Sequence, residues 1–137
     1  MHQLASLLAL GVVTVHILSL LGDRFIGFSI RQLLVPSVSG YQPFWMGIGI
    51  AAFYLTIVVT ASFWVRKRIG NRAWKALHAL SYGAFVLALA HGTFMGNDNA
   101  FWAKLLYWGT GISLALLTLW RVGEGTAHRR LRSLIAS

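Results

Sequence analysis

The stretch HQLASLLALGVVTVHILSLL, residues 2–21, decides how this chain folds. It contains no charged side chain over twenty residues, which is the length that a helix needs to cross a bilayer core of about 30 Å. It lacks a basic n-region and is longer than the apolar core of a signal peptide, so we expect a retained span. Its two imidazoles, His2 and His16, lie 14 residues apart. An ionisable ring in hydrocarbon is costly, so both are candidate functional residues.

Three further apolar runs have the same character. With the first run they predict four membrane helices, at about 2–21, 44–65, 76–95 and 101–121. Of all residues 57% are hydrophobic and only 11% charged, and the runs are continuous rather than alternating, which favours helices over a β-barrel. We therefore expect an all-α, polytopic four-helix bundle over residues 1–121 and a basic tail over 122–137.

The basic residues predict how the chain is oriented. The net charge is +9, and nine of the twelve Lys and Arg residues follow the second or the fourth span. The positive-inside rule makes that face, with both termini, the cytoplasmic side of the plasma (inner) membrane. This distribution serves topology and anionic lipid, and we expect no nucleic-acid partner. The nine residues are Arg66, Lys67, Arg68, Arg72, Lys75, Arg121, Arg129, Arg130 and Arg132.

The link between the first two spans contains a short apolar segment, residues 30–35. The segment could lie as an interfacial turn on the outer surface, or it could cap the outer end of the bundle. The sequence does not decide between these two placements. In the second span Gly47 and Gly49 indicate close helix packing.

Histidines occur in the first and third spans and are absent from the second and fourth. His78 and His91, in the third span, lie 13 residues apart. Since the first and third spans cross in the same direction, His2 shares a level with His78 near the cytoplasmic face. His16 shares a level with His91 nearer the outer face. At 1.5 Å per residue the two levels are roughly 20 Å apart. Two imidazoles at each of two levels suit two haem irons, and these four residues are the candidate metal ligands.

The angular spacing fits this hypothesis less well. Fourteen residues at 100° each return to within about 40° of the starting face, whereas thirteen miss it by about 140°. The third helix must therefore be tilted, kinked or locally overwound, and Ser81–Gly83 is the expected place.

Intramembrane histidines also serve other purposes in membrane proteins. A hydrogen bond across a helix interface is the ordinary use of one intramembrane imidazole. A proton relay would need carboxylates, yet Asp23, Asp98 and Glu124 lie outside the spans. Zinc or copper would need three or four ligands at one level. The chain has no cysteine, so haem would be of the non-covalent b type. We expect His128, among arginines in the tail, to be solvated.

The block RAWKALHALSY, residues 72–82, continues to His91 and Gly92. With the first span it resembles the ferric reductase-like transmembrane domain, a superfamily of b-type membrane cytochromes. That resemblance, over about residues 1–121, implies that the four histidines ligate haem and that the 13-residue spacing is tolerated. The chain departs from the family in starting one residue before His2 and in lacking a flavin and nicotinamide module. A partner subunit could supply the helix that usually precedes the first histidine helix, or the true start of the chain could lie upstream. Because His2 lies in the first turn of its helix, we expect the inner haem to be held less firmly than the outer haem.

The leading hypothesis is transmembrane electron transport through two b-type haems. The chain would be a subunit of an oxidoreductase that works between a separate donor and acceptor, rather than a self-contained enzyme, and no catalytic residue is expected. The alternative is a structural subunit of a larger membrane complex that binds one haem or none. Candidate cofactor-binding residues are Arg72, Lys75 and Arg66 at the inner propionates, Arg31 and Asn97 at the outer ones, and Phe85 between the haems.

Overall fold

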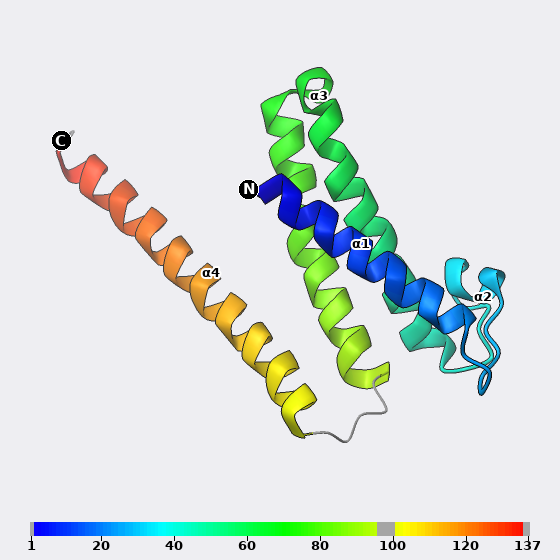
Figure 1. The fold of residues 1–137 in the computed structure, drawn as a ribbon. Coiled ribbons are helices and arrows are strands. Elements are labelled where there is room, and N and C mark those ends of the chain that lie inside the picture. Colours follow the sequence, from blue (N-terminus) through cyan, green and yellow to red (C-terminus); the bar gives the residue numbers. More distant parts are fainter. Residues whose placement is uncertain (1, 96–100, 136–137) are drawn as a thin grey trace. The chain divides into compact units, whose positions relative to one another are not determined.

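The chain is built from helices joined by loops. The computed structural model describes residues 2–95 and 101–135, with the side chains of residues 3–95 and 101–124. Within these ranges there is no strand. The helices are α1 (His2–Leu21), α2 (Ile30–Leu34), α3 (Pro43–Met95) and α4 (Phe101–Ile135) (Figure 1). Three of them contain a segment long and apolar enough to cross a membrane, namely Gln3–Leu21, Pro43–Met95 and Phe101–Glu124. The expectation of an all-α membrane protein is confirmed.

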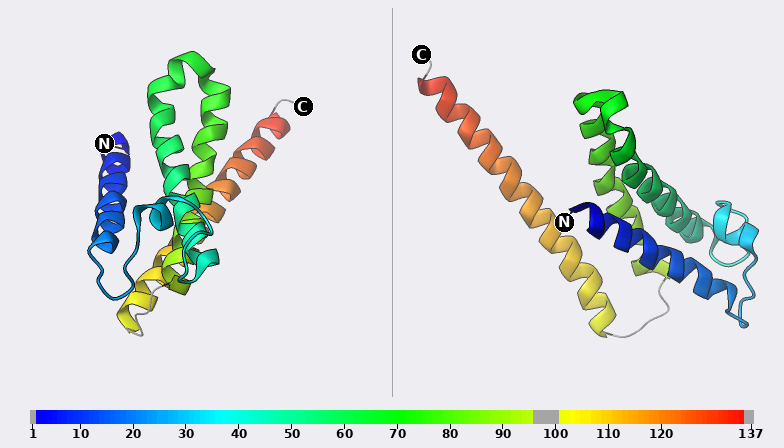
Figure 2. Two further views of the ribbon diagram at one scale, coloured as in Figure 1. Left: turned by 90° about the vertical axis from the view of Figure 1, so that its right-hand side faces the viewer. Right: turned by 45° about the horizontal axis from the view of Figure 1, so that its top comes forward.

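The long helix α3 is a hairpin of two antiparallel arms. Its backbone leaves helical geometry at Gly70, where φ is 79° and ψ is 162°. Residues 43–69 form the first arm and residues 71–95 the second, and the two arms run side by side (Figure 1, Figure 2). The expected second and third spans are these arms, but the link between them is shorter than expected. Residues 66–75 are helical except for one glycine.

Side chains join the arms at both ends. At the open end, the rings of Trp45 and Phe94 stack with centroids 4.2 Å apart. At the tip, the guanidinium of Arg66 lies 4.3 Å from the centre of the Trp74 ring. The same guanidinium donates from Nε and Nη2 to Oδ1 of Asn71, both at 3.2 Å. These contacts fix how the second arm is rotated against the first.

The short helix α2 packs against the open end of the hairpin. Ser29 and Gln32 form a capping box at its start. Leu33 is buried with Met46 and Ile50 of α3. The hydroxyl of Tyr54 donates to the carbonyl oxygen of Leu34 at 2.7 Å. The structure therefore favours the cap over the free interfacial turn for this segment.

The first helix, α1, lies obliquely across the hairpin (Figure 1, Figure 2). None of its described side chains, residues 3–21, is buried. Half-buried positions recur every three or four residues, which is the spacing of one helix face. They are Ser6, Leu10, Val13, Ile17 and Leu20. A narrow stripe therefore holds α1 on α3, and the rest of its surface is left for lipid.

The last helix, α4, belongs to a second unit, residues 98–137, and is described by itself. It has 35 residues and extends to Ile135, beyond the expected end of the fourth span. The four-helix bundle stays a prediction, as does the division into a domain and a tail.

Replacing Gly70 by alanine should destabilise the hairpin. The glycine occupies a backbone region that side chains avoid, so we expect a loss of about 1–3 kcal/mol in the free energy of unfolding. Reversible denaturation in mild detergent, followed by circular dichroism, measures this loss.

Gly11→Ala is the matched control, because a Cβ at Gly11 meets nothing within 4 Å and alanine favours a helix. An alanine at position 70 that costs no more than the alanine at position 11 would contradict this role of Gly70.

Candidate functional site

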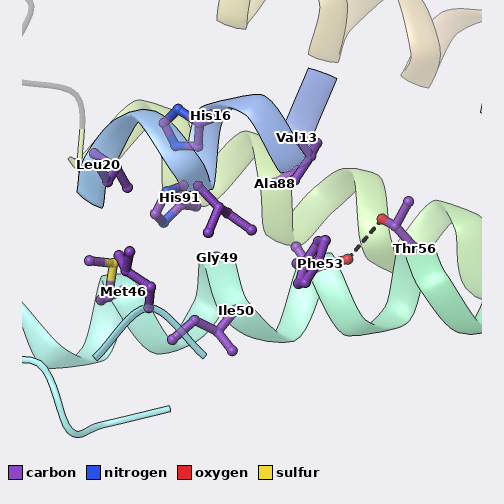
Figure 3. A pocket seen from close by; sticks show the side chains of 13 residues that line it. Val13, His16, Leu20, Met46, Gly49, Ile50, Phe53, Thr56, Ala88 and His91 are labelled. Carbon is purple, nitrogen blue, oxygen red and sulfur yellow. Dashed lines mark hydrogen bonds between the residues drawn. The ribbon is translucent and has the colours of Figure 1, made fainter. Parts of the chain in front are cut away.

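A small apolar cavity lies at the open end of the hairpin, beneath α1 (Figure 3). Its volume is about 140 Å³. Residues of α1, α2 and both arms of α3 line it, and none of them carries a carboxylate, an amine or a thiol. The titratable groups on its wall are two imidazoles, His16 from α1 and His91 from the second arm. The apolar walls include Val13, Ile17, Leu20, Leu33, Met46, Ile50 and Phe53.

The ring of His91 is anchored to the backbone of the opposite arm. Its Nδ1 lies 2.9 Å from the carbonyl oxygen of Trp45. A carbonyl oxygen can only accept, so this hydrogen bond requires the proton on Nδ1. In the neutral ring Nε2 then carries the free lone pair. A histidine that ligates a metal almost always donates its other ring N–H in this way.

Gly49 provides the space for this ring. A Cβ built on Gly49 would lie 2.5 Å from both Nδ1 and Cε1 of His91, closer than any side chain tolerates. A Cβ at Gly47 meets Pro36 and Ser37 at 3.7 Å or more, an ordinary contact. Gly49 therefore packs closely against the imidazole of His91 on the other arm, whereas Gly47 faces the loop before α3.

The ring of His16 reaches the same cavity from α1. The residue is exposed, whereas His91 is half-buried. In the close-up both labelled rings lie at the same end of the cavity, one from each helix (Figure 3). The structure thus brings together the two histidines that the sequence assigned to one level.

The other predicted pair, His2 and His78, stays a prediction. His78 stacks on Trp74, with ring centroids 5.0 Å apart and planes 12° apart, and it does not line the cavity of His16 and His91. His2 begins α1, and its side chain lies outside the described residues.

No break in α3 brings His78 and His91 onto one face. Gly70 is the residue within α3 whose backbone is non-helical, so the kink expected at Ser81–Gly83 is not found. The helix keeps its regular dihedrals there, and the angular mismatch between the two histidines remains.

The remaining candidates lie away from the cavity. Arg72, Lys75 and Arg31 are exposed, and Phe85 is half-buried on the second arm. None of these four lines the cavity. Asn97 lies outside the described residues. The sequence analysis did not predict that Gly49 or the Trp45 carbonyl would contact His91. The signal that could have found them is a small residue on the second span facing a histidine on the third.

The donor set indicates which metals the cavity can serve. Within residues 3–95 and 101–124, no group of three or more His, Cys, Asp or Glu side chains could hold a bare metal ion. A tetrahedral zinc site needs four such ligands, or three and a water. Two imidazoles in an apolar setting instead match the axial ligands of a b-type haem, so the residues present fit that group.

The comparisons with known proteins give one match. A family profile described as "Ferric reductase like transmembrane component" matches residues 1–89. No curated protein and no solved structure matches the chain significantly. The match covers α1, α2 and α3 as far as Leu89, including three of the four intramembrane histidines. Since it spans well over half of the chain, the protein belongs to the ferric reductase-like transmembrane family.

Proposed function

We propose that this membrane protein passes electrons across the bilayer through two b-type haems. Membership of the family supports transmembrane electron transfer in general. The observation that carries the finer proposal is the pair of imidazoles, from α1 and α3, at one apolar cavity. His16 and His91 would hold the outer haem, and His2 and His78 the inner one. When bound, each haem supplies an iron that accepts and releases one electron.

At the outer site the protein supplies ligation and shielding from water. His91 would ligate through Nε2, because its Nδ1 is engaged by the Trp45 carbonyl. His16 faces the same cavity and would ligate from the opposite helix. The surrounding aliphatic side chains exclude water and lower the local dielectric, which tunes the potential of a bound iron.

A porphyrin needs more room than the cavity offers. Pockets for ligands of this class measure roughly 300–1,000 Å³, against about 140 Å³ here. No described side chain of α1 is buried, so α1 can move away from the hairpin with little loss of packing. We propose that haem binding separates α1 from α3 and buries both imidazoles against the porphyrin.

The inner site would lie near the tip of the hairpin. His78 is held against Trp74, and the indole Nε1 of Trp74 is buried without a hydrogen-bond partner in the described part of the chain. A haem propionate would satisfy that donor. Arg72 and Lys75 are exposed near the tip and could neutralise propionate charge, and Phe85 lies between the levels of His78 and His91 along the arm.

The orientation follows from the charges at the tip. Arg66, Lys67, Arg68, Arg72 and Lys75 surround Gly70, and the positive-inside rule places them in the cytoplasm with both termini. We also propose that this membrane is the plasma membrane. Donor and acceptor are separate partners on its two faces, and the chain is the electron-transfer component of an oxidoreductase.

Substituting His91 by alanine should remove the outer haem alone. We expect two haems per wild-type chain by the pyridine haemochrome assay and one in His91→Ala or His16→Ala, because one imidazole cannot complete bis-histidine ligation. His128→Ala is the control and should keep both. No haem in the wild-type chain would support the structural-subunit alternative, and two in His91→Ala would overturn the ligand pairing.

Electron transfer across a bilayer can be measured in vesicles that enclose ferricyanide. External dithionite should reduce the enclosed ferricyanide several-fold faster with the haem-loaded wild-type chain than in protein-free vesicles. The His16→Ala chain should lose most of this rate, because one of the two stacked carriers is missing. Equal rates for wild-type and protein-free vesicles would contradict transmembrane transfer.

A further inference from the structure

The contact between the arms of α3 does more than pack them. In a regular helix the carbonyl of Trp45 accepts the N–H of the residue four positions later, which is Gly49. A carbonyl oxygen has two lone pairs, but a side chain at the later position covers the one that faces outward. With no Cβ at Gly49 that lone pair is open, and His91 Nδ1 reaches it at 2.9 Å.

We propose that Gly49 is a positioning residue, which lets the Trp45 carbonyl set the tautomer and orientation of His91. The ring turns its face to the bare backbone at Gly49, because a built Cβ would lie 2.5 Å from Nδ1 and Cε1 and only 2.9 Å from Cγ. Nδ1 keeps the proton, and Nε2 is the nitrogen left to ligate at the cavity.

The stack of Trp45 on Phe94 supports the same arrangement. Phe94 lies three residues after His91 on the second arm, and its ring is 4.2 Å from that of Trp45 with planes 16° apart. The residue that supplies the carbonyl is thus tied by its own side chain to the arm that carries the histidine. Two contacts therefore hold the Trp45 carbonyl close to the His91 imidazole: their own hydrogen bond and the stack of Trp45 on Phe94.

The consequence for a bound iron rests on the proposed function. A hydrogen bond from Nδ1 to a carbonyl makes Nε2 more basic, and so a stronger metal ligand. It also prevents the ring from rotating. Gly49 would therefore raise the affinity of the outer site for haem by positioning His91.

The tautomer can be tested without any haem. The full chain, labelled with ¹⁵N-histidine and placed in lipid nanodiscs, should show a protonated, hydrogen-bonded Nδ1 and an unprotonated Nε2 for His91. The signal is assigned by its loss in His91→Gln. In Gly49→Ala the hydrogen-bonded Nδ1 signal should disappear, whereas Gly47→Ala should leave it unchanged. A proton on Nε2 of His91 in the wild-type chain would overturn the proposal, whether or not the variants fold.

The effect on the site is measured by titrating ferric haem into the same nanodiscs. The His78→Ala background leaves only the site of His16 and His91. There Gly49→Ala should weaken haem binding by about 10–100-fold, and Gly47→Ala should not change it. Unchanged affinity in Gly49→Ala would overturn the positioning role. No binding to any chain would instead contradict the proposed function, while the tautomer measurement still decides the role of Gly49.

Discussion

The hydrogen bond from His91 Nδ1 to the Trp45 carbonyl, across Gly49, is the constraint on which the candidate site depends. It joins residues 46 positions apart on the two arms of α3. It also decides which ring nitrogen is free. In a membrane such a bond has a further value, since water does not compete for the donor or the acceptor within the hydrocarbon region. The hairpin thus supplies one imidazole whose tautomer and orientation are set before any ligand arrives.

The second imidazole is held differently. None of the described side chains of α1, residues 3–21, is buried, and His16 is an exposed residue. One wall of the cavity is therefore set by the hairpin and by α2, whose Leu33 is buried against α3. The other wall, formed by α1, touches the hairpin only through its narrow stripe of half-buried side chains. In the proposed mechanism, α1 would move aside so that a cavity of about 140 Å³ could admit a large planar ligand. In this account His91 determines the geometry of the site, and His16 closes it.

The sequence predicted the features that depend on local composition and on the depth of a residue in the membrane. Hydropathy predicted α1 and the two arms of α3, and the common level of His16 and His91 predicted that they would meet. The one-residue turn at Gly70 was not predicted, because the five basic residues within 66–75 indicated a link between two spans and not the continuation of both helices. The role of Gly49 depends on how one arm is rotated against the other, which spacing along a single helix does not contain. The kink expected at Ser81–Gly83 was also predicted from spacing along a single helix, and the structure shows a regular helix between His78 and His91.

The most direct test of this account is a density map of the full chain loaded with haem in lipid nanodiscs. The account predicts a planar porphyrin between α1 and the hairpin, with its iron bonded to Nε2 of His91 and to the imidazole of His16. His91 Nδ1 should remain on the Trp45 carbonyl. A map in which the rings of His16 and His91 point apart, with no porphyrin between them, would contradict it.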